Sequence, residues 1–400
     1  MYGRARFSYA RQVTHLPPHF TLLQVTPELE TGGAEQTTID VAAAVVKAGG
    51  RALVASRGGR MAGQLAQAGG KLIEMPAHSK NPIRLFDNAI RLIGLIRSEG
   101  VHIVHARSRA PAFSALWAAK AAGVPFVATY HGVYNARGDL KRWYNSVMTR
   151  GELVIANSEY TRRHVIAEHA IAPEEVVAIP RGVDLAYFDP VKVTERRLAA
   201  LRAAWGLERD EPRVKILLAG RLTRWKGQGL LIGAAARLKA SGEKRFLILL
   251  AGDDQGRSAY RIELERQIAQ AGLEENVRLV GHCEDMPAAY MLADVAAAPS
   301  LDPEAFGRTA VEPQAMGRPV LAANHGGATE TVLNGKTGWL VEPGDPEAWA
   351  QALGKVVRMT PRRRQEMGEA ARARATSLYS VEAMCEATLA VYARLLEGRA

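Results

Sequence analysis

The chain has 400 residues, which is too many for one ordinary hydrophobic core, so two domains of about 150–200 residues each are expected. Its apolar fraction of 48% is ordinary for a globular protein, and no apolar run approaches the ~20 residues that would cross a bilayer. The net charge of +11 lies mostly before Asp189 and suits a nucleic acid, an anionic lipid or a phosphorylated substrate alike.

The N-terminus and the cysteines indicate a cytoplasmic protein. The first 19 residues contain three arginines but no apolar centre of the kind found in signal peptides. Cys283 and Cys385 have neither ligand-like nor redox-like spacing, which fits a reducing compartment. Neither a disulfide nor a structural metal is expected.

Short apolar segments alternate with longer amphipathic ones along the first half, a pattern typical of parallel α/β sheets. Helices are predicted over Ala34–Ala48 and Leu85–Ser98. The predicted strands are Phe20–Thr26, Arg51–Ser56, Ile103–Ala106, Phe126–Thr129 and Leu153–Ala156.

A polar, proline-bearing connection with a charged helix, Val183–Leu207, separates this series from a second one. The strands predicted there are Lys215–Ala219, Phe246–Ala251, Val277–Val280, Val295–Ala298 and Val320–Ala323. The predicted fold class is therefore α/β, with two Rossmann-like, doubly wound domains that face each other across a cleft.

Loops that follow the predicted strands carry the informative residues, because ligands of open α/β sheets bind at the carboxyl ends of strands. Gly32 and Gly33 precede a helix and offer backbone N–H groups to an anion or a sugar, although they do not form the Gly-x-Gly-x-x-Gly of a nicotinamide site. His131 ends a strand, where it either hydrogen-bonds a substrate hydroxyl or is satisfied by the backbone.

The loop from Gly220 to Gly227 places Arg221 and Lys226 between a strand and a helix. A planar guanidinium and an ammonium would together neutralise a diphosphate. A P-loop is excluded because Lys226 is followed by Gly227 and Gln228 rather than by a hydroxyl residue. By itself such a basic loop is more often a solvated surface.

The strongest motif runs from Glu304 to Glu312 and lies between a strand and a helix predicted from Gly307 to Met316. The first turn of that helix offers unpaired N–H groups and the positive end of the helix dipole to an anion. Glu312 would accept the ribose hydroxyls, and Glu304 would reach a bound sugar. Taken singly, each glutamate could instead be an acid favoured by the dipole.

These motifs, in this order, resemble the family-4 retaining glycosyltransferases of GT-B fold over essentially the whole chain from about Phe20. The resemblance implies catalytic roles for Glu304, Arg221, Lys226 and His131, and no metal. It also implies a larger donor-binding set, which is Gly32, Gly33, Arg221, Lys226, Gly281, His282, Glu304, Ala305, Phe306, Gly307, Arg308, Thr309 and Glu312.

The resemblance further implies an acceptor-side domain over residues 1–185 and a nucleotide-sugar domain over 186–379. The last helix, Tyr379–Glu397, would carry residues 380–400 back onto the first domain. Many relatives carry Asn where Arg181 stands, a change that affects acceptor or hinge contacts rather than the reaction.

The implied function is transfer of a sugar from a nucleoside-diphosphate sugar, with UDP favoured on family frequency, to a glycan or lipid-linked acceptor. Retention of configuration and a role in cell-envelope polysaccharide or lipopolysaccharide synthesis are expected, without cofactor, metal or nucleic acid. The alternatives are an isomerase of the UDP-N-acetylglucosamine 2-epimerase type and a non-catalytic sugar-binding protein. The basic segment Arg137–Arg150, with Trp143 and Tyr144, either contacts an anionic membrane at the inner face or packs into the core.

Overall fold

The computed structural model describes residues 16–30, 32–134, 138–256 and 258–397, and these form two compact units. Unit 1 comprises residues 1–182 together with 381–400, and unit 2 comprises residues 183–380. The chain thus passes from unit 1 to unit 2 and returns to unit 1 at its end.

Unit 1 is built on a seven-stranded sheet in the order β3-β2-β1-β4-β5-β6-β7, and every pair is parallel. The order changes direction between β1 and β4, which is the switch point where open α/β sheets bind ligands. The strands are β1 Thr21–Val25, β2 Arg51–Ser56, β3 Lys71–Glu74, β4 Ile103–Ala106, β5 Phe126–Tyr130, β6 Leu153–Ala156 and β7 Val176–Ala178.

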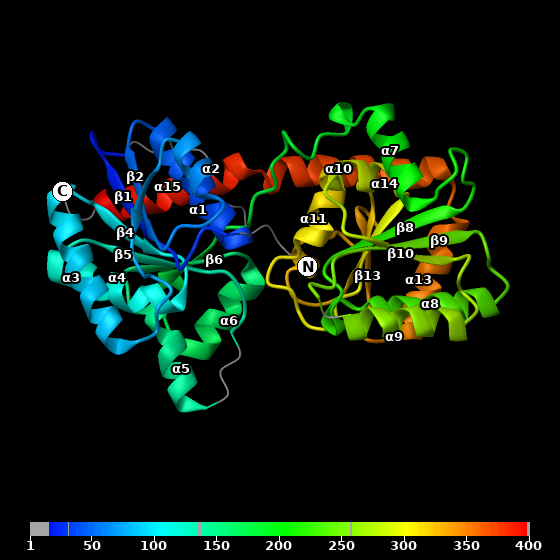
Figure 1. The fold of residues 1–400 in the computed structure, drawn as a ribbon, viewed down its shortest axis with the longest axis horizontal. Coiled ribbons are helices and arrows are strands. Elements are labelled where there is room, and N and C mark those ends of the chain that lie inside the picture. Colours follow the sequence, from blue (N-terminus) through cyan, green and yellow to red (C-terminus); the bar gives the residue numbers. More distant parts are fainter. Residues whose placement is uncertain (1–15, 31, 135–137, 257, 398–400) are drawn as a thin grey trace. The chain divides into compact units, whose positions relative to one another are not determined.

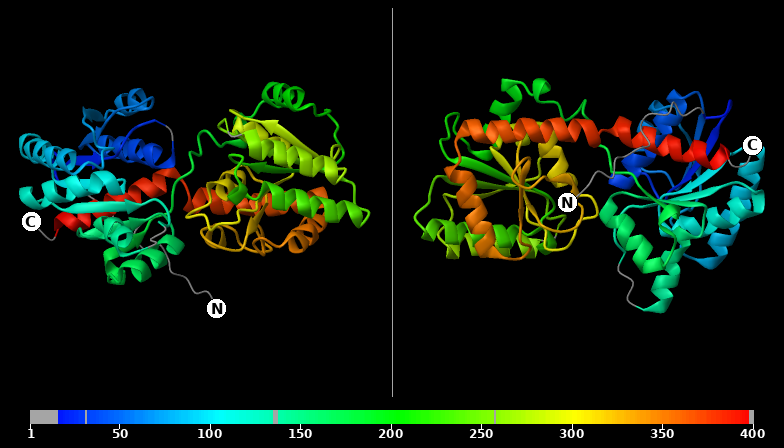
Figure 2. Two further views of the ribbon diagram at one scale, coloured as in Figure 1. Left: turned by 60° about the horizontal axis from the view of Figure 1, so that its bottom comes forward. Right: turned by 180° about the vertical axis from the view of Figure 1, so that it is seen from behind.

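Helices cover both faces of the unit-1 sheet (Figure 1). Helices α1, α2 and α15 pack on one face, and α3, α4 and α6 pack on the other. The red helix α15 lies against this sheet in both views of Figure 2. The helices are α1 Gly33–Lys47, α2 Ala62–Gln67, α3 Pro82–Ser98, α4 Arg109–Ala122, α5 Asp139–Asn145, α6 Glu159–His169 and α15 Val381–Glu397, with 3₁₀ turns at Ser146–Thr149 and Pro173–Glu175.

Unit 2 repeats this architecture with a six-stranded parallel sheet in the order β10-β9-β8-β11-β12-β13. Its order changes direction between β8 and β11. The strands are β8 Val214–Ala219, β9 Phe246–Ala251, β10 Val277–Gly281, β11 Val295–Ala298, β12 Val320–Ala323 and β13 Gly338–Val341. The two doubly wound sheets confirm the predicted fold class.

The helices of unit 2 also form two layers (Figure 1). Helices α8, α9 and α13 cover one face of the sheet, and α7, α10 and α11 cover the other. The helices are α7 Glu195–Trp205, α8 Gln228–Ala240, α9 Ser258–Gln270, α10 Met286–Leu292, α11 Arg308–Ala315, α12 Ala328–Thr331, α13 Pro346–Arg358 and α14 Pro361–Leu378, with 3₁₀ turns at Pro190–Lys192 and Arg224–Lys226.

Several helices begin at a polar residue followed directly by proline. Asn81, Asp345 and Thr360 accept hydrogen bonds from the N–H groups of the first turns of α3, α13 and α14. Proline fits the position that follows because its missing N–H is not needed there. These pairs fix where the helices begin.

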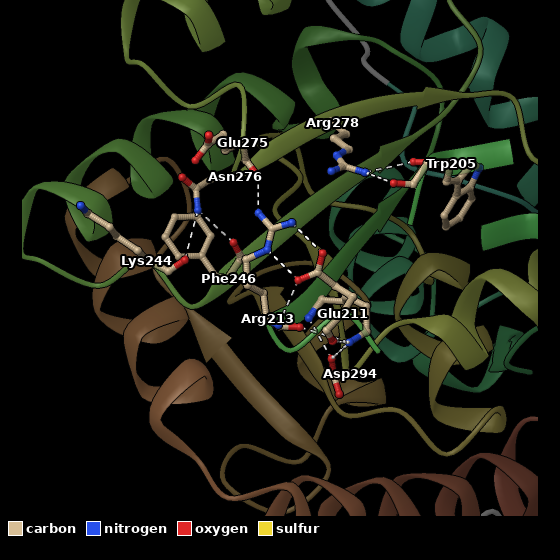
Figure 3. A network of polar contacts seen from close by, with 11 residues as sticks. Trp205, Glu211, Arg213, Lys244, Phe246, Glu275, Asn276, Arg278 and Asp294 are labelled. Carbon is tan, nitrogen blue, oxygen red and sulfur yellow. Dashed lines mark hydrogen bonds and ion pairs between the residues drawn. The ribbon is translucent and has the colours of Figure 1, made fainter. Parts of the chain in front are cut away.

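Polar contacts fasten the loops at the amino ends of the unit-2 strands (Figure 3). The guanidinium of Arg213 donates to the carboxylate of Glu211 at 2.7 Å, and this bond lowers the pKa of Glu211 to about 2. Asn276 donates to the carbonyl oxygen of Phe246 at 3.0 Å, and Arg278 donates to that of Gly206 at 2.6 Å. These contacts hold the loops at the amino ends of the strands in place.

No helix in the described part of the chain combines the length and the apolar character that a membrane-crossing segment needs.

Candidate active site

The basic motif and the acidic motif of unit 2 lie together at the switch point of its sheet. The loop with Arg221 and Lys226 follows β8, and the loop with Glu304 follows β11. Strands β8 and β11 are neighbours, and the strand order changes direction between them. The fold therefore brings together two motifs that lie about 80 residues apart, which the sequence could only suggest.

The loop after β8 is held close to the sheet. The buried side-chain amide of Gln228 donates to the carbonyl oxygen of Arg221 at 2.9 Å. Gly227 has a φ of 79°, and a Cβ there would lie 2.0 Å from the carbonyl oxygen of Pro299, so only glycine allows this approach. Arg221 itself stays exposed, whereas Lys226 is largely covered and lies 4.4 Å from the ring centroid of Trp225.

An ion pair connects the two loops. The Nζ of Lys226 donates to Oε1 of Glu304 at 2.8 Å, and the hydroxyl of Ser300 donates to the same oxygen at 2.5 Å. The side chain of Lys226 is 11% exposed and that of Glu304 is 16% exposed. Both hydrogen bonds to Glu304 use Oε1, so among the described residues Oε2 has no donor and remains available to a ligand hydroxyl.

Two glycines of the loop after β12 set the position of the Glu304 loop. The N–H of Gly327 donates to the carbonyl oxygen of Glu304 at 2.7 Å. A Cβ on Gly327 would lie 2.6 Å from Cα of Phe306, and one on Gly326 would lie 2.5 Å from the carbonyl oxygen of Glu304. A small pocket adjoins this loop, and its lining includes Ser300, Glu304, Gly307, Thr309 and His325.

Helix α11 begins where it was predicted, after Gly307 with a φ of 80°, and ends before Met316. Its carboxylate Glu312 is 13% exposed and lies 3.1 Å from Nε of Arg308. The hydroxyl of Tyr290 donates to Glu312 at 3.3 Å. Burial raises the pKa of Glu312 above its ordinary value, although the positive charge of Arg308 opposes this shift.

This arrangement suits an anion with attached hydroxyl groups. Arg221, Lys226 and the N-terminus of α11 supply positive charge and N–H donors, and Glu304 and Glu312 accept hydrogen bonds on either side. Ala305, Phe306, Arg308 and Thr309 lie within the loop and the first turn that connect these two glutamates. Among the described residues, no group of three or more His, Cys, Asp or Glu side chains is arranged to hold a metal ion.

Two residues predicted to hold the base lie beside a different hollow. Gly281 ends β10 with a φ of 76°, and His282 after it is exposed. His282 lines a groove of about 730 Å³ with residues of α7, including Trp205. This groove and the pocket at Glu304 share no lining residue.

The remaining predicted residues belong to unit 1. Gly32 and Gly33 lie at the start of α1, where the Glu35 side chain folds back so closely that a Cβ on Gly32 would be 2.5 Å from Oε2 of Glu35. His131 follows β5, and Nη2 of Arg181 donates to its Nδ1 at 3.1 Å. Arg137 lies outside the described residues.

Sequence reasoning missed the residues that hold the two glutamates in place. Ser300 donates to Glu304, and Nε2 of His325 lies 2.9 Å from the carbonyl oxygen of Ser300. Tyr290 reaches Glu312 from α10. Ser300 and His325 lie at strand ends beside recognised motifs, which is the signal that could have found them, but nothing in the sequence around Tyr290 marks it.

Comparisons with known proteins identify families for both units. A family model described as "Glycosyl transferases group 1" matches residues 202–374, and one described as "Glycosyltransferase Family 4" matches residues 31–187. A D-inositol 3-phosphate glycosyltransferase of Xylanimonas cellulosilytica is 32% identical over 319 residues, which cover 76% of this chain and 74% of that protein. Matches to four other curated relatives of the same name span only 49–63% of their length.

Solved structures agree over nearly the whole chain. A glycosyltransferase of Rickettsia africae is 34% identical with a TM-score of 0.86, and the match covers 94% of this chain and 99% of that one. HepE of Anabaena, solved in complex with UDP-glucose, is 25% identical with a TM-score of 0.78, and the match covers 95% of this chain and 100% of that one. The chain therefore belongs to the group 1, family-4 glycosyltransferases and has their GT-B fold.

Proposed function

We propose that the protein transfers a sugar from a UDP-sugar to a hydroxyl of a glycan or glycolipid acceptor, with retention of the anomeric configuration. The observation that carries the proposal is the Lys226–Glu304 pair at the switch point of unit 2, where a cation and a free carboxylate oxygen lie side by side. The relative HepE, solved with UDP-glucose, supports uridine as the base.

In this mechanism the bond from the anomeric carbon to the diphosphate breaks while the acceptor hydroxyl bonds to that carbon from the same face, and the hydroxyl proton passes to the departing phosphate oxygen. The leaving group develops negative charge, which Lys226 and the N-terminus of α11 stabilise from fixed positions and the exposed Arg221 stabilises once the ligand orders it. Two carboxylates invite an acid–base mechanism like that of glycoside hydrolysis. Because Oε1 of Glu304 is already held by Lys226 and Ser300, we assign Glu304 to a sugar hydroxyl and Glu312 to the ribose.

The donor is tested by thermal-shift measurements with UDP, GDP and ADP, since a ligand that binds only the folded state raises its melting temperature. A rise with UDP alone is expected. Incubation with the matching sugar nucleotide but no acceptor should give no isomerised product and at most slow hydrolysis. An epimerised sugar nucleotide would contradict the proposal in favour of the isomerase.

Two acceptor classes follow from the relatives and the family. We favour a glycan or lipid-linked acceptor of the cell envelope, such as a lipopolysaccharide core, whereas the relatives named D-inositol 3-phosphate glycosyltransferase suggest an inositol phosphate. Transfer assays with a core oligosaccharide and with inositol 3-phosphate, each with the same donor, separate the two. Transfer to inositol phosphate alone would contradict the envelope acceptor.

Transfer is proposed to need no metal, because Lys226 and Arg221 provide the charge that a bound cation would otherwise bring to the diphosphate. Activity should therefore persist in excess EDTA. Loss of activity in the chelator, restored by a divalent cation, would contradict this part of the proposal.

The protein is further proposed to work in the cytoplasm, in peripheral contact with the inner face of the membrane. Leu140 is 80% exposed and Trp143 is 55% exposed, and Lys141 and Arg142 lie between them. Such a surface suits anionic lipid. Sedimentation with anionic vesicles at low salt should carry the protein into the pellet, and a protein that stays in the supernatant would argue against membrane contact.

A further inference from the structure

The carboxyl ends of the strands on the β4 side of the unit-1 switch point carry a second charged cluster, which donor binding in unit 2 does not use. Arg107 follows β4 and His131 follows β5, and these strands are neighbours. Arg181 lies three residues after β7, and its side chain reaches His131. These three residues form what we call the Arg–His cluster.

Arg107 is a buried cation whose hydrogen bonds go to neutral groups. It is 3% exposed, and its Nε donates to the side-chain oxygen of Gln24 at 2.9 Å. Its Nη1 donates to the hydroxyl of Thr129 at 3.3 Å. Burial lowers the pKa of Arg107, and Tyr392, Cys385 and Asp40 offset this only in part. A charge buried without a close carboxylate is costly unless the site has a use for it.

His131 is held as a hydrogen-bond donor. A guanidinium can only donate, so Nδ1 of His131 must accept the 3.1 Å hydrogen bond from Arg181. Burial, then the charges of Arg181 and Arg107, lowers the pKa of His131 well below its ordinary value. The ring is therefore neutral, and its proton lies on Nε2.

The Nε2–H group of His131 is shielded from water and has no acceptor among the described residues. An unsatisfied donor in such a place is rare and destabilising, which indicates that a ligand oxygen belongs there. The same tautomer excludes His131 as a general base, because neither ring nitrogen has a free lone pair. Arg181, which contacts this ring, is itself partly exposed to solvent.

We propose that the Arg–His cluster binds an anionic group of the acceptor, a phosphate monoester or a carboxylate. Arg181 would contact the anion directly, Nε2 of His131 would donate to one of its oxygens, and Arg107 would supply positive charge from behind. Assigning the anion to the acceptor rests on the proposed glycosyl transfer, whereas anion binding by itself does not. The acceptor hydroxyl would then lie on a molecule anchored by its charge.

The test uses the full chain with saturating UDP, so that the anion site of unit 2 is occupied. The rise in melting temperature is followed against inorganic phosphate and, separately, acetate, at constant ionic strength. R181Q should bind phosphate at least about tenfold more weakly than wild type, because one charge-assisted hydrogen bond is lost. If acetate binding also depended on Arg181, the acceptor would carry a carboxylate. If only phosphate binding did, the acceptor would carry a phosphate ester.

R163Q is the matched control, since Arg163 is an exposed arginine of unit 1 and its loss changes the net charge equally. Equal phosphate affinity in R181Q and R163Q would overturn the proposal. Loss of phosphate binding in K226A but not in R181Q would also overturn it, because the anion would then occupy the donor site. If R181Q fails to fold, R181K replaces it, because lysine keeps the charge but lacks the planar guanidinium. If R181K and H131F both bound phosphate as tightly as wild type, the proposed role of the Arg–His cluster would be refuted.

The two proposals fail separately. Absence of a UDP shift in wild type, with phosphate still dependent on Arg181, would remove the donor assignment and leave the anion site. If UDP raised the melting temperature of wild type but R181Q bound phosphate normally, the donor assignment would stand and the anion site would be removed.

Discussion

Lys226 is the residue on which donor chemistry depends most directly. It is nearly covered and already paired with Glu304, so it meets the diphosphate from a fixed position, whereas Arg221 is exposed and must be ordered by the ligand. K226A should lower kcat by about 10²–10³-fold, as loss of one preorganised donor does, and R221A should lower it less. Steady-state transfer assays measure both effects.

R224A is the control for this comparison. Arg224 lies in the same loop but pairs with Glu263 on the surface, so its removal should leave kcat near that of wild type. Near-normal turnover in both K226A and R221A would contradict the electrostatic role of the loop.

Glu312 should strengthen UDP binding but lower the folding stability of the protein without ligand. Burial raises its pKa, so the folded state favours the protonated form, and folding stability falls as the pH rises through that pKa. E312Q should therefore melt at a higher temperature than wild type at pH 7. The gain should vanish below about pH 4.5, where both states of Glu312 are protonated.

UDP should bind E312Q more weakly, because the ribose loses a charged acceptor. Melting curves from pH 4 to 8, with and without UDP, measure both effects together. A variant that is less stable than wild type at pH 7, or that keeps full UDP affinity, would contradict the assignment.

At this scale the sequence predicted which residues belong to one site, but not the hydrogen bonds that position them. Glu304, Lys226 and Glu312 were recognisable from their motifs, and the fold brings the first two into contact. Ser300 lies at a strand end just before the Glu304 motif and could have been found, but the hydrogen bond from Tyr290 to Glu312 was not predictable, because Tyr290 lies on a separate helix. A tertiary contact of this kind has no local sequence pattern.

At the scale of elements, the loop after β12 works as a support for the Glu304 loop. Gly327 has a φ of −66°, so alanine is allowed by the backbone, but its Cβ would lie 2.6 Å from Cα of Phe306. G327A should therefore displace the Glu304 loop and weaken UDP binding by about tenfold or more, the effect of one misplaced charged contact. Titration with UDP measures this change.

G233A is the matched control, because a Cβ on Gly233 within α8 has its nearest neighbours at 3.9 Å. That variant should bind UDP normally and be at least as stable as wild type, since alanine favours a helix interior. If G327A bound UDP as well as G233A does, the loop contact would have no bearing on the site.

The elements that sequence reasoning missed have one property in common. All ten predicted strands are present, and the three others, β3, β7 and β13, each lie at the edge of a sheet. An edge strand has one neighbour, so it is short and need not be apolar: β3 is Lys-Leu-Ile-Glu with both ends exposed, and β7 has three residues. The pattern of continuous buried apolar residues found every central strand but only one edge strand, β10.

On the scale of the whole molecule, each unit has its own core. The two buried clusters of unit 2 contain only residues between 183 and 379. The core of unit 1 draws on both ends of the chain, because α15 contributes Met384, Cys385 and Val391 to it. The hydroxyl of Tyr392 also lies 2.6 Å from Nδ1 of His105 on β4. Helix α15 thus completes the core of the first unit.

Fragments should reproduce this division. Residues 183–380 expressed alone should unfold cooperatively and be stabilised by UDP, because core, Lys226 and Glu304 all lie within them. Residues 1–182 alone should show no cooperative transition, since the apolar surface that α15 covers would face water. Joining 381–400 to residue 182 through a short glycine linker should restore it, because Gly182 already contacts Met384. A stable fragment 1–182, with or without UDP present, would mean that α15 is dispensable for the core and serves only to tie the chain's end to it.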